Sequence, residues 1–162
     1  MKYLIKYLIY ILEHKKNVFI ECWKIGLYWH AITHDLSKFL PSEFFPYAKK
    51  FFGGDYAYKY FEVEDNFSKA WKLHYSRNKH HWNYWIEYRQ NGDAMYCPEI
   101  AQFALPMPEK YVLQMIADWK GMSRKFGDTA VEFYAKNLSK MILHSETKKI
   151  INKKLKTAEE GK

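Results

Sequence analysis

The chain of 162 residues has the usual size of one domain, and its 48% apolar and 19% aromatic content is typical of a folded globule and excludes a disordered chain. A formal net charge of +8 favours binding of polyanions, which include nucleotides, nucleic acid and an anionic membrane surface. The two cysteines, Cys22 and Cys97, form no CxxC pair, which excludes a zinc or redox motif of that type and fits a reducing cytoplasm.

The first predicted element is an apolar run over residues 1–12. Lys6 interrupts the run, no small-residue cleavage site follows it, and it is shorter than the roughly 20 residues that a membrane span needs. We therefore expect neither a signal peptide nor a transmembrane segment. The spacing of the apolar residues predicts a helix that packs in the core and ends near Glu13, with attachment to a membrane surface as the less favoured alternative.

Two further helices are predicted in the first half of the chain. Apolar residues from Val18 to Ile32 keep helical spacing, which places the doublet His34-Asp35 within a helix or at its end. Pro41-Ser42-Glu43 indicates the next helix start, because proline and acidic side chains favour a first turn, and Gly53-Gly54 ends this helix. Residues 55–66 show no clear period and are predicted to form a loop or a short helix.

The second half is also predicted to be helical. A long helix is expected from Phe67 to Tyr88, before the turn signal Asn91-Gly92-Asp93, and three prolines predict an ordered loop from Cys97 to Pro108. The other helices are expected to begin at Pro108-Glu109, after Gly127-Asp128-Thr129 (about 130–141), and at Ser145 (to about Lys156). No segment alternates like a strand. The prediction is an all-α bundle of about six to eight helices in one domain, residues 1–158, with a flexible tail at 159–162.

Histidines and aspartates are distributed over several predicted helices in a way that suits a metal site. A helical bundle builds such sites from side chains that point inward from facing helices. An isolated histidine is more often a hydrogen-bonded core or surface residue than a ligand, so the prediction depends on the whole ordered set. The members of this set are His14, His34-Asp35, His74, His80-His81 and Asp118.

The ordered pattern of a His, a His-Asp doublet, later histidines and a distant Asp resembles the HD-domain superfamily of metal-dependent phosphohydrolases, and the run HDLSK resembles its HD-x-x-K variant. The resemblance implies an all-α bundle in which His14, His34, Asp35 and Asp118 hold a first divalent metal. In binuclear branches Asp35 would bridge to a second metal, bound by His74 and one later histidine. The wider chain is similar to a family of small bacterial and phage proteins through the segments HKKNVF, THDLSKF, PSEFFPYAK, RNKHHWNYW and MPEKYVLQMIADW.

Helix geometry helps to assign the later histidines. His74 and His81 are seven residues apart and would lie nearly in line on a continuous helix, with Asn78 close to the same face, whereas His80 would point away. We therefore predict His74 and His81 as ligands, and His80 as a residue that faces the substrate or supports a ligand, unless the helix ends or bulges at Asn78. A competing arrangement binds one zinc through His30 and the histidine four residues later, but it leaves both aspartates unused.

The predicted activity is hydrolysis of a phosphoester of a nucleotide or a related small substrate, with one or two ions of Mn, Fe, Co, Zn, Ni or Mg. Asp35 and Lys38 are the predicted catalytic residues, and the substrate would be held by Lys38, Arg77, Asn78 and His80. Glu43 suits either a helix start or a histidine partner.

The alternative function is that of a non-catalytic, phage-type binding protein that sequesters a nucleotide, nucleic acid or a host factor. No motif of a nucleic-acid reader is present, and a homo-oligomer is left open.

Overall fold

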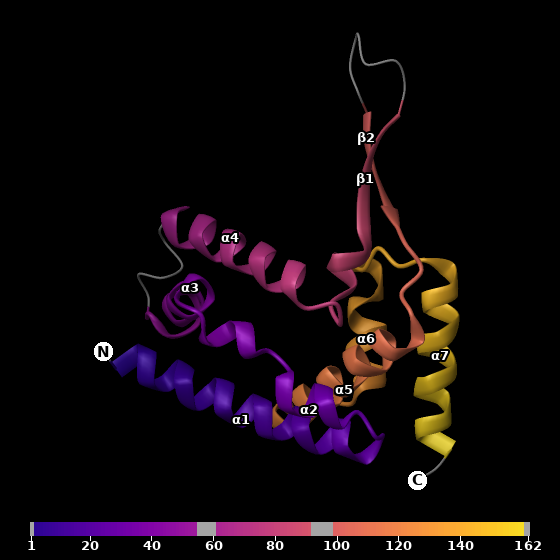
Figure 1. The fold of residues 1–162 in the computed structure, drawn as a ribbon, viewed down its shortest axis with the longest axis horizontal. Helices are drawn as coiled ribbons and strands as arrows, with labels where there is room; N and C mark the ends of the chain where they lie inside the picture. Colours follow the sequence, from indigo (N-terminus) through magenta and orange to yellow (C-terminus); the bar gives the residue numbers. More distant parts are fainter. Residues whose placement is uncertain (1, 55–60, 92–98, 161–162) are drawn as a thin grey trace.

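The structure is a computed structural model that describes residues 2–54, 61–91 and 99–160. These residues form seven α-helices and one antiparallel pair of strands (Figure 1). This confirms the all-α class, and none of the described helices is long and apolar enough to cross a membrane. In chain order the elements are α1 Lys2–Lys24, α2 Tyr28–Thr33, α3 Pro41–Phe52, α4 Phe61–Arg77, β1 Ile86–Asn91, β2 Glu99–Ala104, α5 Glu109–Phe126, α6 Ala130–Asn137 and α7 Ser145–Glu160.

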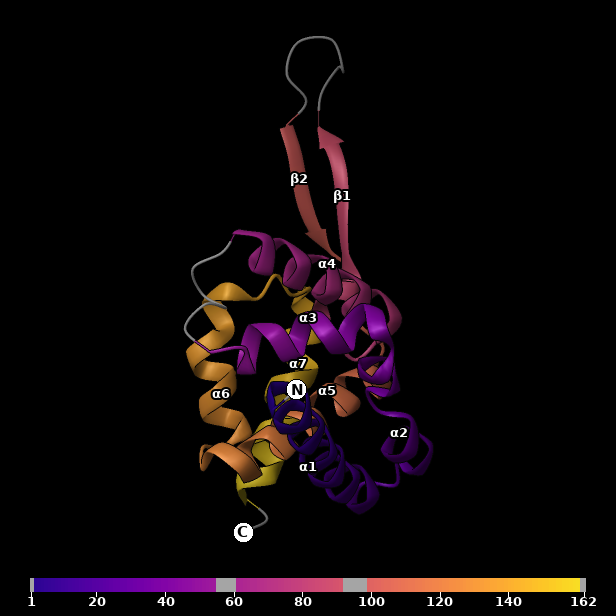
Figure 2. The same cartoon turned by 90° about the vertical axis from the view of Figure 1, so that its left-hand side faces the viewer.

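The helices enclose separate clusters of buried apolar side chains. One cluster joins α1, α3 and α4 through residues that include Tyr7, Ile11 and Tyr47. Another joins α5, α6 and α7 and is built around Trp119 and Ile151. Figures 1 and 2 show the hairpin β1–β2 extending away from these helices. The bundle therefore has two packed halves, with α1 and α5 in contact between them.

Close approach of α1 and α5 depends on Gly121. An added Cβ at this residue would lie 2.5 Å from Val18 Cγ2 and 2.9 Å from the Val18 backbone nitrogen. A smaller cluster formed by Val18, Cys22, Ala31 and Ala117 fills the space around this contact. The contact lies about one helical turn from His14 on α1 and from Asp118 on α5, so it sets how near these two side chains can come.

Several predicted boundaries hold, among them the start of α3 at Pro41 and the helix that follows Pro108. Thr129 caps α6 with a capping box, in which its side chain and that of Glu132 exchange hydrogen bonds with each other's backbone N–H groups. The predicted gap between Glu13 and Val18 is wrong, because α1 runs unbroken through it. The stretch contains no helix breaker, and His14 and Val18 continue the buried face of the helix.

The predicted helix from Phe67 to Tyr88 is wrong in its second half. α4 ends at Arg77, and a 3₁₀ turn over Trp82–Trp85 leads into β1. The expected loop from Cys97 to Pro108 is corrected in the same way, since β2 pairs with β1 in a register that sets Ile86 opposite Ala104. The aromatic and β-branched residues of the Trp85–Tyr88 stretch have high strand propensity, which overrides a helical apolar spacing.

The helix predicted without a break from Val18 to Ile32 is divided, because α1 ends at Lys24 and α2 begins at Tyr28, with Gly26 between them at φ 76°. The other differences concern the ends of elements. α6 stops at Asn137 and continues as a 3₁₀ turn over Leu138–Lys140, and α7 extends to Glu160, beyond its predicted end near Lys156 and through residues 159–160 of the predicted tail. The predicted features at residues 55–60, at Gly92-Asp93 and at Cys97 lie outside the described residues.

Candidate metal centre

A sharp turn after α2 brings His34 and Asp35 into the protein. His34 caps α2, with its backbone N–H donating to the His30 carbonyl, and Asp35 has a left-handed backbone with φ 54° and ψ 26°. Among the described residues Asp35 is the one non-glycine residue with positive φ, a conformation that aspartate tolerates better than most residues. The Lys15 ammonium donates to the carbonyls of Ile32 and His34, at 2.8 and 2.9 Å, and fixes this turn.

Four ligand atoms from α1, the turn and α5 converge in a first group. His14 Nε2 lies 3.1 Å from His34 Nε2, 3.5 Å from Asp35 Oδ2 and 3.3 Å from Asp118 Oδ1. His34 Nε2 lies 3.3 Å from Asp35 Oδ2 and 3.6 Å from Asp118 Oδ1. A tetrahedral cation with bonds of about 2.1 Å would have ligands about 3.4 Å apart. The separations between the two histidines and each carboxylate are therefore those expected of ligands that share one cation, and His14, His34 and Asp35 lie mutually closest.

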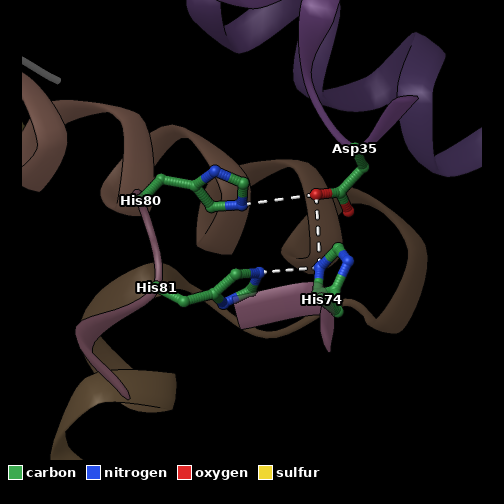
Figure 3. A group of neighbouring side chains, drawn as sticks. All are labelled: Asp35, His74, His80 and His81. Carbon is green, nitrogen blue, oxygen red and sulfur yellow. Dashed lines mark hydrogen bonds and ion pairs between the residues drawn. The ribbon is translucent and has the colours of Figure 1, made fainter. Parts of the chain in front are cut away.

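A second group uses the other oxygen of Asp35 (Figure 3). Asp35 Oδ1 lies 3.4 Å from His74 Nε2 and 3.4 Å from His80 Nε2, and His81 Nε2 lies 2.9 Å from His74 Nε2. His74 projects from the last turns of α4, whereas His80 and His81 come from the segment after it. The two oxygens of one carboxylate thus face two separate sets of nitrogen atoms.

The chemistry of this donor set fits divalent cations. Asp35 Oδ1, Asp118 Oδ1 and His80 Nε2 are buried and make no hydrogen bond. Unpaired buried polar atoms of this kind are rare in proteins and costly to desolvate. In addition, His14 and His34 point ring nitrogens at each other and at two carboxylates, an arrangement that a cation satisfies with all four groups as acceptors. The described residues could therefore hold one cation in each group.

The surroundings keep these groups in the protonation states that metal ligands need. Burial lowers the pKa of His34 and of His81 well below the ordinary histidine value, so both imidazoles are neutral. Burial alone would raise the pKa of Asp35. Its electrostatic contacts with the His34 imidazole, the Lys38 ammonium and the His74 imidazole outweigh this effect and hold the Asp35 pKa well below its usual range. The carboxylate is therefore ionised.

Glu43 orients His74 from behind. Its Oε2 lies 2.8 Å from His74 Nδ1 and accepts a hydrogen bond from Ser37, and its Oε1 accepts from Arg77 at 2.6 Å. Burial raises the Glu43 pKa, but the hydrogen bonds from His74, Arg77 and Ser37 outweigh burial and lower it. Glu43 is fully buried in the first turn of α3, so it serves both as a helix start and as a histidine partner.

Two residues predicted to hold the substrate are engaged in this same network. Arg77 donates to Glu43 and to Ser42, and Asn78 donates to Ser37 Oγ and to the His74 carbonyl, both at 2.8 Å. Arg77 retains 38% side-chain exposure. Arg77 therefore helps to position Glu43, and Asn78 helps to position His74, on the side of His74 that faces away from Asp35.

Lys38 and His80 both contact Asp35 directly, unlike Arg77 and Asn78. The Lys38 ammonium lies 2.6 Å from Asp35 Oδ2. Burial lowers its pKa, but the nearby carboxylates of Asp35 and Asp118 outweigh burial and raise it, so the side chain is charged. His80, expected to point away from His74 and His81, faces Asp35 because α4 ends before it. The group that could hold a cation with Asp35 therefore includes His80 as well as His81.

The competing pair of His30 and His34 is also brought together. His34 Nδ1 lies 3.2 Å from His30 Nε2, and His80 completes a third group of imidazoles around them. Burial lowers the pKa of His30 to about 4, so this imidazole is neutral. With His34 Nε2 turned toward Asp35, its Nδ1–H is placed to donate to His30, which fixes the His34 ring. The i, i+4 spacing was the sequence signal for this contact.

A cleft of about 400 Å³ opens beside both groups. Its polar wall includes His14, Lys38, His81 and Asp118, and Lys140 lines it as well. The remaining lining is rich in aromatic and apolar side chains: Tyr10, Trp71, Trp82, Met115, Trp119, Met122, Phe133 and Met141. Such a cleft has the size of a small-molecule site, with a few polar groups at one wall.

Comparison with known proteins gave a single result. No curated protein and no solved structure matched the chain. A family model described as a family of unknown function, DUF5662, matches residues 4–157, which include every residue of both groups. The chain therefore belongs to the DUF5662 family.

Proposed function

We propose that this protein is a metal-dependent phosphohydrolase that cleaves a phosphoester of a nucleotide or a related small phosphorylated substrate. The observation that carries the proposal is the position of Asp35, whose two buried oxygens each face a separate set of imidazole nitrogens. The resemblance of the ligand order to the HD-domain superfamily supports the same activity. The cleft beside the two groups supports a small substrate.

In this proposal His14, His34, Asp35 and Asp118 hold one divalent cation, and Asp35 shares a second with the following three histidines: His74, His80 and His81. Bound divalent cations would supply a polarised water as nucleophile and would neutralise charge on the phosphoryl oxygens. Glu43 keeps the His74 ring turned toward Asp35, and His30 does the same for His34.

Lys38 is the residue proposed to contact the phosphate. It is charged, it lines the cleft, and its ammonium lies beside Asp35. Lys140 lies in the lining of the same cleft and offers a further positive charge to an anionic substrate. The aromatic lining suits a flat base or another apolar group attached to the phosphate. This combination favours an organic phosphoester over free inorganic polyphosphate.

The test is metal loading followed by turnover. The purified chain, stripped with EDTA and reloaded with Mn²⁺ or Co²⁺, should retain one to two metal ions per chain by mass spectrometry of the metal. It should also hydrolyse a member of a panel of nucleotide mono-, di- and triphosphates and cyclic nucleotides, with release of phosphate, pyrophosphate or nucleoside or, from a cyclic nucleotide, of the nucleoside monophosphate. Asp35→Asn should reduce both metal retention and turnover by at least about 100-fold, because loss of a partner that only orients a ligand already costs about 10–100-fold.

A matched control is Asp65→Asn, which makes the same chemical change at an exposed aspartate on α4 that pairs with Lys69 and belongs to neither ligand group. It should leave both readouts unchanged. Absence of retained metal together with absence of turnover across the panel would overturn the proposal. Metal retention without turnover would instead favour a non-catalytic binding protein.

A further inference from the structure

The helix α1 has apolar side chains on the face that points away from the protein. Its buried face carries Tyr7, Ile11, His14, Val18 and Cys22. The opposite stripe, at helical spacing, consists of Ile5, Leu8, Ile9, Leu12, Phe19 and Trp23, with exposures from 38% to 60%. An ordinary surface helix would carry polar residues there. Figures 1 and 2 both show α1 at the periphery of the molecule. The exposures place this stripe on its solvent side.

Exposed aromatic rings extend this stripe beyond the end of α1. Phe19 stacks on Trp23 with ring centroids 5.1 Å apart, and Trp23 meets Tyr28 at the start of α2 at 4.6 Å. Tyr28 and Trp29 remain 54% and 78% exposed. At its other end the stripe adjoins an apolar groove of about 710 Å³, which Ile9 shares with Phe51 and Phe126. We call the stripe and the Tyr28–Trp29 aromatic extension the α1 face.

Charge distinguishes the partners that could cover the α1 face. Exposed lysines lie within the stripe, as Lys16 does, or along its margin, as Lys2, Lys6 and Lys24 do. The two carboxylates of α1 are both engaged by basic side chains: Glu13 pairs with Lys125, and Glu21 with Lys24 and Arg124. A second copy docked symmetrically would oppose lysine to lysine, which is unfavourable. An anionic surface would complement the whole face.

We propose that the α1 face binds an anionic lipid bilayer surface. α1 would lie in the plane of the membrane, with its outward apolar side chains at the boundary of headgroups and acyl chains and its lysines among anionic headgroups. Trp23, Tyr28 and Trp29 are of the amphipathic aromatic type that concentrates at this depth. The helix spans about 34 Å at 1.5 Å per residue, so many headgroups can be contacted at once. This function is separate from the metal centre.

Vesicle sedimentation tests the proposal with the full chain. The protein should sediment with vesicles of equal phosphatidylglycerol and phosphatidylcholine, and at least tenfold less with pure phosphatidylcholine or at 0.5 M NaCl. Leu12→Asp, at the centre of the stripe, should weaken this binding at least tenfold. Phe61→Asp likewise replaces an exposed apolar residue with aspartate, at a position on α4 that is 89% exposed, and should have no effect. Circular dichroism establishes that both variants are folded.

The charge contribution has its own pair of variants. Lys16→Glu should weaken binding to anionic vesicles several-fold, whereas Lys69→Glu, a 69% exposed lysine on α4, should not. Failure of the unmodified chain to bind anionic vesicles would overturn the proposal. A Leu12→Asp variant that binds these vesicles as tightly as the unmodified chain would overturn it too. Light scattering measures the oligomeric state of the protein without vesicles. If the unmodified chain is a dimer and Leu12→Asp is a monomer, the α1 face is a contact between two copies, and the membrane assignment is overturned.

Discussion

Replacing Gly121 with alanine should force α5 away from α1. The new Cβ would stand 2.5 Å from Val18 Cγ2, 2.9 Å from its backbone nitrogen and 3.0 Å from its Cα. Carbon atoms in contact normally lie about 3.5–4.0 Å apart. A change of the Val18 rotamer removes only the first clash, because the other two involve the backbone of α1. The helices must therefore separate.

The magnitude follows from two opposing effects. Overpacking of this kind costs about 1–3 kcal/mol, while alanine in a helix interior gains about 0.5–1 kcal/mol over glycine. We expect Gly121→Ala to lose about 1–2 kcal/mol of unfolding free energy on balance. Since Asp118 and His14 lie about one turn from the contact, the separation should also pull these two groups apart and weaken Zn²⁺ or Mn²⁺ binding.

Urea unfolding followed by circular dichroism, together with metal titration, measures both effects. The control is Gly127→Ala, at the left-handed end of α5, where φ is +80° and no atom lies within 4 Å of the added Cβ. Backbone strain should cost this variant about 1 kcal/mol without changing metal affinity. Adding Val18→Ala to Gly121→Ala should restore only part of the loss. A Gly121→Ala protein as stable as the parent, with unchanged metal affinity, would refute the reasoning.

Three other perturbations test further parts of the structure. Glu43→Ala should cost about 1–3 kcal/mol by leaving its buried partners unpaired, and should lower metal affinity by about 10–100-fold in a titration. Thr129→Ala removes the capping box of α6 and should cost about 1 kcal/mol in urea unfolding, with metal affinity unchanged. In the metal-free protein, unfolding free energy should fall as pH drops below about 6.5, because burial lowers the pKa of His30, His34 and His81 and only the unfolded chain takes up these protons. In urea titrations from pH 7.5 to 5, the unfolding free energy should change by up to about 1.4 kcal/mol per pH unit for each histidine. An unfolding free energy that does not change with pH would contradict this prediction.

The helices were predictable where residues with strong local preferences mark their ends. Pro41 and Gly53 bound α3, and Thr129 with Glu132 begins α6, because these residues act through their own backbone geometry and hydrogen bonds. The hairpin was not predictable from period alone. The segment before it has apolar spacing compatible with a helix, and the β1–β2 pairing is a contact between residues that are distant in the chain.

The sequence predicted which residues come together at the candidate site better than it predicted how they are arranged there. The order of histidines and aspartates sufficed to select the residues that converge on Asp35, since each lies on an inward-facing position. The direction of His80 was predicted only for a continuous helix, with the exception of a helix that ends at Asn78, and the exception applies because α4 ends at Arg77. Arg77 and Asn78 were assigned to the substrate, but whether a polar side chain faces a cleft or a neighbour depends on tertiary contacts.

The left-handed backbone of Asp35 has a consequence for how position 35 can vary. Most residues with a β-carbon lose about 1–2 kcal/mol in this conformation, whereas glycine, asparagine and aspartate adopt it readily. Alanine there would combine a backbone penalty with loss of the carboxylate, so its effect could not be assigned to either. Glycine would keep the turn but remove every ligand atom. Asparagine alone retains the turn and the shape while it removes the charge, so the tolerance of this one position separates the requirements of folding from those of chemistry.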